Sequence, residues 1–187
     1  MKKFRIFFLL QLFVLTLFGQ TENEILWKEN KKLVWDDFQA KPQMGHKASA
    51  LTNASAQFYL QQEGKKLKID TRVFFRKDGS WVKPDAHQDN LLQHEQTHFD
   101  IYELFSRKYR KYISELNTNK APQKLVDKMA KSFKVYQKKA KKMQDKYDKQ
   151  TNFSRNIEEQ KKWSTKINLA LKSLNQYNNP YIEIKIP

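Results

Sequence analysis

Residues 94–98 read His-Glu-Gln-Thr-His and lie in a segment whose apolar residues recur every three or four positions. On an α-helix, positions i and i+4 share one face, so His94 and His98 can offer two imidazole nitrogens to one metal ion. Glu95 is rotated by about 100° from His94, where its carboxylate can accept a proton from a water that the metal activates. The pattern predicts a zinc site with two ligands and a general base.

Two other interpretations of these histidines stay open. A helix can carry two His and a Glu on a solvated surface without binding metal. However, His94 and His98 fall on the apolar stripe that also contains Leu91, Phe105 and Tyr109. We therefore expect a buried or half-buried wall, where imidazoles need partners. A metal ion would supply them, but hydrogen-bonded core histidines would fit too.

The elements expected before the motif are extended. Leu33–Phe38 reads as a strand or extended segment, and Ala50–Leu60 alternates as one strand. Residues 61–65, which include Gly64, form a hairpin connection to a second strand over Leu67–Phe75. A turn at residues 77–80 then leads toward the motif.

The elements expected from the motif onward are mainly helical. Helical periodicity predicts a motif helix over Asp85–Leu116, with Asp85 or Asp89 as N-cap, and a break at 117–122. A second helix follows, with an apolar seam from Leu125 to Tyr147, and a polar interruption at 148–156 ends it. A third helix is expected over Ile157–Leu174, and alternation predicts a strand over Ile182–Ile186. Antiparallel strands followed by a long motif helix and two more helices make an α+β, zincin-like domain. By fold-level analogy, an edge strand of the sheet would align an extended peptide.

The N-terminus resembles a secretory signal peptide. Lys2, Lys3 and Arg5 precede an apolar stretch, and Gly19 follows it. We expect residues 1–19 to be the signal peptide and 20–187 to be one domain, with an uncleaved N-terminal anchor as the alternative. The chain has no Cys, so no disulfide supports the fold, which suits a secreted or periplasmic bacterial protein.

The charge of the chain is strongly basic. The formal net charge is +16, and removal of the three basic residues of the signal leaves 16 − 3 = +13. Many of the lysines fall on the second helix, where they are typical of a solvated face. We therefore expect no specific nucleic-acid site, no membrane span after signal removal and a monomer.

The residues around the His-Glu-Gln-Thr-His motif identify a protein family more specifically than the motif itself does. They are residues 80–84 (Ser-Trp-Val-Lys-Pro) and 91–101, Trp35-Asp36-Asp37-Phe38 upstream, and residues 147–151, Gln160 and Trp163 downstream. Through these residues the chain resembles a bacterial family of predicted secreted zinc-dependent proteases, otherwise a domain of unknown function. The resemblance covers about residues 30–165. It implies a zincin-like metallopeptidase.

The chain departs from this family at one position. The resemblance implies a His just after the Thr that matches Thr151, as a candidate third ligand, but Phe153 stands there. Catalytic zinc normally has three protein ligands and a water. Asp148, near that segment, is the best substitute, although a surface carboxylate at a helix end is an equal alternative.

Other candidate ligands fit less well. If His87 shares the motif helix, it lies about 10 Å from His94, too far for one ion. His46 could approach only through a loop. Asp100 and Glu103 are rotated away from the His face, and hydrogen bonding around the site suits Asp100 better.

The residues thus predict a secreted hydrolase in which His94, His98 and Asp148 bind Zn²⁺ and Glu95 is the general base for hydrolysis of a peptide or protein substrate. One alternative is a weak or inactive relative that keeps the fold to bind an envelope partner, which the Phe153 substitution favours. A more remote one is a protein that binds anionic polymers through its basic surface.

Overall fold

The computed structural model describes residues 21–118 and 121–187. The expected signal peptide, residues 1–19, lies outside the described residues. Among the residues described, no helix has both the length and the apolar character needed to cross a bilayer.

A four-stranded antiparallel sheet is built around one long strand. The central strand is β4 (Lys66–Arg76), which pairs along its length with β3 (Ala54–Glu63). On its other side, β4 pairs near its end with β1 (Glu24–Leu26) and near its start with β6 (Tyr181–Lys185). The alternation of apolar residues along β4 places one face against the helices.

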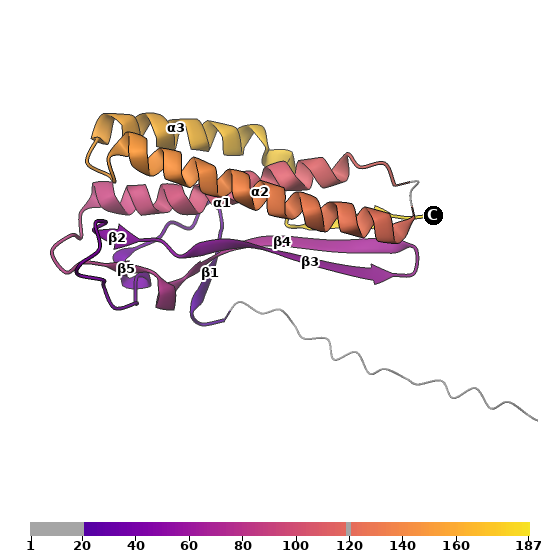
Figure 1. The fold of residues 1–187 in the computed structure, drawn as a ribbon, viewed down its shortest axis with the longest axis horizontal. Coiled ribbons are helices and arrows are strands. Elements are labelled where there is room, and N and C mark those ends of the chain that lie inside the picture. The colour runs from indigo at the N-terminus through magenta and orange to yellow at the C-terminus, as the bar shows by residue number, and fades with distance from the viewer. Residues whose placement is uncertain (1–20, 119–120) are drawn as a thin grey trace, which may run out of the picture.

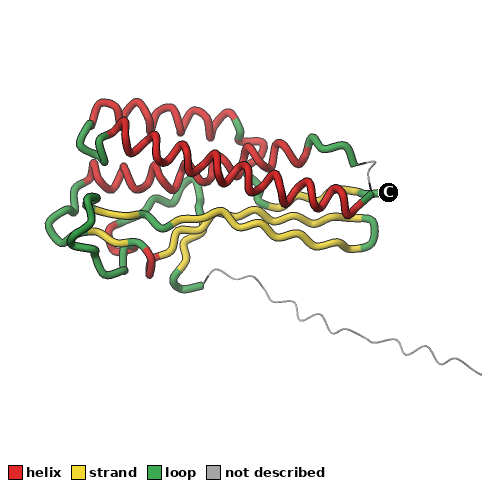
Figure 2. The backbone as a smooth tube through the Cα atoms, in the orientation of Figure 1, coloured by secondary structure: helices red, strands yellow, loops and turns green. Residues whose placement is uncertain are grey.

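Three helices cover one face of this sheet (Figures 1 and 2). The motif helix α1 (Asp89–Ser114) lies between the sheet and a second helical layer made of α2 (Pro122–Thr151) and α3 (Ile157–Ser173). Short 3₁₀ turns occur at Trp35–Asp37, Lys77–Gly79 and Asn175–Tyr177. The α+β architecture expected from the sequence is confirmed.

The predicted strand over Ala50–Leu60 is two strands. β2 (Ala50–Leu51) leaves the main sheet and pairs with β5 (Trp81–Val82) beside the start of α1. The break falls where the Thr52 hydroxyl donates to the carbonyl of Glu95 and the N–H of Asn53 donates to the Ser80 hydroxyl. These tertiary hydrogen bonds replace the ladder and bring β2 to the motif.

Two further expectations about local structure were wrong in detail. Leu33–Phe38 contains no strand: Val34 is extended, as the alternative reading expected, but the Asp37 carboxylate then accepts the Val34 N–H and closes a 3₁₀ turn over Trp35–Asp37. α1 starts at Asp89 with Gln88 as N-cap, so neither expected Asp is the cap. Residues 84–88 instead form a turn in which the Ala86 N–H donates to the Lys83 carbonyl.

Hydrophobic core residues pack against α1 on two sides. Toward the sheet, Phe99 packs with Val73 and Phe75, and toward the other helices Ile101 and Leu104 meet apolar residues of α2 and α3. Because α1 is buried on both sides, its register against β2 and α2 is fixed, and the motif residues are fixed with it.

Candidate metal centre

The two motif histidines lie one turn apart on α1 with their rings facing the same point. Their Nε2 atoms are 3.1 Å apart. His94 is only 3% exposed, and His98 is half-buried. The expected buried or half-buried wall is therefore confirmed.

Asp148 joins this pair from the last turn of α2. Its Oδ1 lies 3.1 Å from Nε2 of His94 and 2.9 Å from Nε2 of His98. The three atoms form a nearly equilateral triangle with edges of 2.9–3.1 Å. We call His94, His98 and Asp148 the metal triangle. Zinc bonds of about 2.0–2.1 Å in tetrahedral geometry need ligand atoms about 3.3 Å apart. The donor set thus fits one face of a four-coordinate ion, and these three residues could hold a metal ion.

Gln144, one turn before Asp148 on α2, fixes the tautomer of His98. Its side-chain amide nitrogen donates to the backbone carbonyl of His98 at 2.9 Å, so its amide oxygen is the atom that contacts Nδ1 of His98. An amide oxygen only accepts, so Nδ1 carries the proton and Nε2 of the neutral ring presents a lone pair to Asp148. Two acceptors at 2.9 Å repel each other unless a proton or a metal ion lies between them. The contact between Nε2 of His98 and Asp148 therefore requires either a proton or a metal ion.

The protonation equilibria of the metal-free cluster reflect the same demand. Burial would raise the pKa of the Asp148 carboxyl, but the hydrogen bonds from His94 and His98 outweigh it and hold that pKa well below its usual range. Burial lowers the pKa of His98, yet the hydrogen bond to Asp148 and the nearby Glu95 charge raise it overall. Without metal, the cluster favours a proton shared between imidazole and carboxylate.

Tyr147 supports the histidines from behind. Its ring stacks on His94, with centroids 4.5 Å apart and planes inclined by 20°, and it meets His98 edge-on. Burial raises the pKa of the Tyr147 hydroxyl, so this side chain stays neutral. Nδ1 of His94 is buried and has no hydrogen-bond partner among the described residues. Metal-binding histidines usually have an acceptor there, so the His94 ring is held by stacking rather than by a hydrogen bond.

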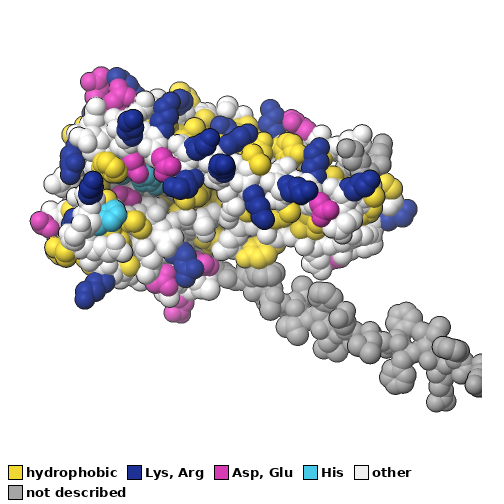
Figure 3. Space-filling view, viewed as in Figure 1, with side chains coloured by type: hydrophobic (Ala, Val, Ile, Leu, Met, Phe, Trp, Pro, Cys, Tyr) yellow, Lys and Arg dark blue, Asp and Glu magenta, His cyan; other side chains and the backbone are white. Residues whose placement is uncertain are grey.

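A cavity of about 220 Å³ opens onto the triangle. Figure 3 shows His side chains at and beside a hollow that borders the Lys-rich face of α2. Its walls come from β2 and the loop before it, from α1 and from the end of α2, and include Ala50, Thr52, Glu95, Tyr102 and Phe153. The site is thus reachable by a ligand larger than water.

Glu95 is the second carboxylate of this cavity. It is 3% exposed, and its carboxylate makes no hydrogen bond or ion pair with any residue in the described ranges. Its backbone carbonyl accepts the Thr52 hydroxyl, which ties the motif to the segment between β2 and β3. A buried carboxylate without a partner, in a cavity beside the ligand triangle, is suited to accept a proton from a bound water.

Phe153 lines the same cavity from just beyond α2 and is 44% exposed. It lies in a run of three left-handed residues, with φ of 48° at Asn152, 52° at Phe153 and 73° at Ser154. This run turns the chain back after α2, and the N–H of Phe153 donates to the carbonyl of Asp148. The position that departs from the resembled family is therefore next to the metal triangle.

The other candidate ligands lie apart from the triangle. His46 lines the cavity and packs edge-on to Trp81, but it does not join the three clustered atoms. His87 precedes α1 and contacts Trp35 outside the cavity. Glu103 pairs with arginines farther along α1.

Gln96 and Asp100 face the side of α1 opposite the triangle. Asp100 accepts from the Trp27 indole at 2.7 Å and from Gln96 at 2.8 Å, and Gln96 accepts the Leu33 N–H. These motif residues anchor the N-terminal segment to α1. The expected hydrogen-bonding role of Asp100 holds, but toward Trp27 rather than toward a metal.

Three contributors to the site were not predicted from the sequence: Gln144, Tyr147 and Thr52. A signal existed for Gln144, because it lies four residues before Asp148, the same spacing that unites the histidines. The contact of Thr52 spans 43 residues and has no local signal.

Comparison with known families gives one match, over the part of the chain that contains the motif. Residues 76–155 match a family described as a bacterial protein of unknown function (DUF922). The match includes α1, α2 and all the residues of the triangle, and it is narrower than the resemblance over residues 30–165. No curated protein and no solved structure matches the chain.

Proposed function

We propose that this protein is a zinc-dependent metallopeptidase in which His94, His98 and Asp148 hold the ion and Glu95 is the general base. The observation that carries the proposal is the convergence of three ligand atoms within 3.1 Å of one another beside a buried, unpaired glutamate. Two imidazoles and a carboxylate are donor types found in catalytic zinc sites with three protein ligands.

A zinc ion held by this triangle would lower the pKa of its water and polarise a peptide carbonyl. Glu95 would accept the proton of the attacking water and deliver it to the leaving amine. In the zinc-bound form, Gln144 would accept the Nδ1 proton of His98 and leave Nε2 for the ion, and Tyr147 would hold the His94 ring in place. The walls from β2 and Phe153 would receive the substrate chain on either side of the scissile bond.

The proposal includes export and a single domain. Residues 1–19 would act as a signal peptide, and residues 20–187 would work as a secreted or periplasmic monomer. The substrate would be a peptide or an unstructured protein, since the cavity is small and bounded by a short strand.

Zinc content and hydrolysis test the proposal together. Purified mature protein should carry one equivalent of zinc by elemental analysis and cleave a quenched fluorescent peptide library. Glu95→Gln should keep the zinc and lose hydrolysis by a factor of about 10²–10⁴, because only the base is removed. Hydrolysis by Glu95→Gln at the wild-type rate would show that the mechanism is wrong.

A second candidate function follows from Phe153. If this ring replaces a ligand of active relatives, the protein would be a weak or inactive member that binds an envelope partner. The same experiment separates the two functions: a folded protein without zinc and without hydrolysis would support the binding role.

A further inference from the structure

A second cavity, of about 300 Å³, lies on the opposite side of α1 from the metal triangle. Its inner wall carries three side chains of α1: Glu103, Arg107 and Arg110. Its outer rim is the turn from Lys28 to Lys31, whose residues 28–30 are exposed. None of these groups takes part in the proposed hydrolysis.

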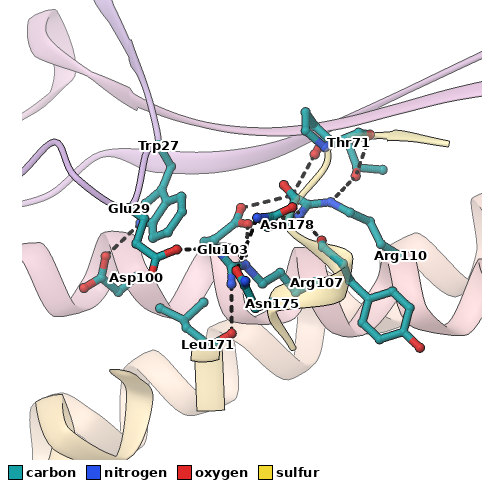
Figure 4. A network of polar contacts seen from close by, with 12 residues as sticks. Trp27, Glu29, Thr71, Asp100, Glu103, Arg107, Arg110, Leu171, Asn175 and Asn178 are labelled. Carbon is teal, nitrogen blue, oxygen red and sulfur yellow. Dashed lines mark hydrogen bonds and ion pairs between the residues drawn. The ribbon is translucent and has the colours of Figure 1, made fainter. Parts of the chain in front are cut away.

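Two buried arginines at this cavity share one buried carboxylate. Arg107 and Arg110 are each 1% exposed, and both bind the one buried carboxylate of Glu103 at 3.0 Å (Figure 4). Arg72, which also lines the cavity, is matched by its own partner Asp70 at 2.6 Å. Two guanidinium groups therefore share one buried carboxylate, and the next carboxylate near them is the exposed one of Glu29, 3.8 Å from Arg107.

Backbone carbonyls solvate the rest of the two guanidinium groups. Arg110 is fully engaged, because it donates to Thr71 and to the carbonyls of Tyr177 and Asn178. Arg107 donates through Nη1 to the carbonyl of Leu171 in the last turn of α3. Carbonyl oxygens carry partial charges, so they solvate a guanidinium without neutralising it.

One donor of this network remains available. Nη2 of Arg107 makes no hydrogen bond to any residue in the described part of the chain. The carboxylate of Glu29 faces it at 3.8 Å, beyond hydrogen-bond distance. The Glu29 side chain is 58% exposed on the rim turn, and Figure 4 shows it reaching inward beside Trp27. A loosely held surface carboxylate thus occupies the approach to a buried guanidinium.

We propose that this cavity binds a small organic carboxylate, with its head group on Nη2 of Arg107. A guanidinium N–H forms a charge-assisted hydrogen bond with a carboxylate, and Nη2 is the nitrogen of Arg107 that Glu103 and Leu171 leave available. The remaining walls, which include Leu26, Trp27, Val73 and Pro180, would contact an apolar body. The volume is in the range of small-molecule sites and is too large for a bare inorganic ion. Glu29 would compete with the ligand at the entrance.

Benzoate and its neutral isostere benzamide test this assignment. In NMR titrations of the mature protein, benzoate should shift the Trp27 indole and Arg107 Nε signals saturably. Benzamide should bind about tenfold or more weakly, because it lacks the charge that the guanidinium recognises. Equal binding of the two compounds, or no saturable shift, would overturn the proposal. Saturation of the same signals by inorganic phosphate but not by benzoate would also overturn it.

Glu29→Gln is the decisive variant, because the Glu29 side chain is 58% exposed and its ion pair with Arg107 is long, at 3.8 Å. This variant should bind benzoate about two- to fivefold more tightly than wild type, since the competing charge is gone. Glu158→Gln, at an exposed glutamate of α3, is the matched control and should leave the affinity unchanged. An unchanged affinity in Glu29→Gln would contradict the site.

Discussion

Gln144 binds His98 at two points, since its amide nitrogen donates to the His98 backbone carbonyl while its amide oxygen contacts Nδ1 of the ring. One side chain of α2 therefore sets both the register of the motif turn and the tautomer of its imidazole. Asp148 follows one turn later on the same face of α2 and reaches Nε2 of the same ring. The ligand set depends on how α2 packs on α1, and not only on the motif.

Replacement of Gln144 should weaken zinc binding without removing a ligand. Gln144→Leu keeps the size of the side chain but loses the acceptor for Nδ1, so the ring can adopt the wrong tautomer. We expect the zinc affinity to fall by about 10- to 100-fold, as measured by competition with a chelator.

Gln144→Glu is the informative partner variant. It keeps an acceptor at Nδ1 and should recover much of the zinc affinity lost in Gln144→Leu, although it cannot donate to the His98 carbonyl. Equal zinc affinities of the Leu and Glu variants would mean that Gln144 acts only through packing.

Asp148→Asn tests the third ligand directly. An amide oxygen is a far poorer zinc ligand than a carboxylate, so the loss of affinity should exceed the about 10- to 100-fold expected for a supporting residue. Asp145→Asn, three residues earlier on α2 and exposed, is the matched control and should bind zinc like wild type. If both variants bind zinc equally well, the third ligand lies elsewhere.

The sequence predicts most of the fold because its periodic segments are long. The Leu67–Phe75 alternation and the His94–Tyr109 stripe each extend over several turns or pleats, so β4 and α1 follow from burial alone. Where a single tertiary hydrogen bond decides the local structure, the local sequence pattern does not predict it. The break at Thr52 depends on the carbonyl of Glu95, which is 43 residues away.

The candidate site likewise has one part that the local sequence predicts and another that depends on tertiary packing. The His94–His98 pair is a local helical pattern and is readable from spacing. The selection of Asp148 over other carboxylates depends on the crossing of α1 and α2, which no local pattern encodes. The Glu103 network was likewise not predicted, because its partners come from α1, from β4, from the last turn of α3 and from the chain after it.

The stability of the metal-free protein should depend on pH through Asp148 and His98. The pKa of Asp148 is lowered on folding, so its contribution is present above the ordinary value of 3.8 and is lost as the pH falls through the folded value. The pKa of His98 is raised, so its contribution is complete below 6.5 and is lost as the pH rises through the folded value. Chelator-treated protein should therefore melt highest between these limits, and Asp148→Asn should flatten both flanks.

Zinc should reverse the upper flank of this profile. Metal and protons compete for the imidazoles, so the rise in melting temperature on adding zinc should be larger at pH 8 than at pH 5.5. Thermal unfolding with and without zinc measures this difference. A zinc-induced rise that is independent of pH would mean that zinc binds elsewhere.

Phe153→His should raise zinc affinity, because Phe153 lines the cavity of the metal triangle at the position where the resemblance implies a His. The backbone there is left-handed with φ of 52°, a conformation that His adopts more readily than Phe, and the side chain is 44% exposed. The change should therefore not lower the melting temperature, and it should create or increase hydrolysis.

The sharper test places Phe153→His in the Asp148→Asn background. If position 153 can supply a ligand, the double variant has three imidazoles and should recover the zinc binding that Asp148→Asn loses. Phe153→Asn is the matched control, since Asn also tolerates the left-handed backbone but offers no imidazole. Zinc titration and thermal unfolding should be measured on all four variants. If His and Asn at position 153 give the same zinc affinity and the His variant melts at a lower temperature, then Phe153 is an ordinary packing residue. The hypothesis that Phe153 stands in place of a third zinc ligand would then be wrong.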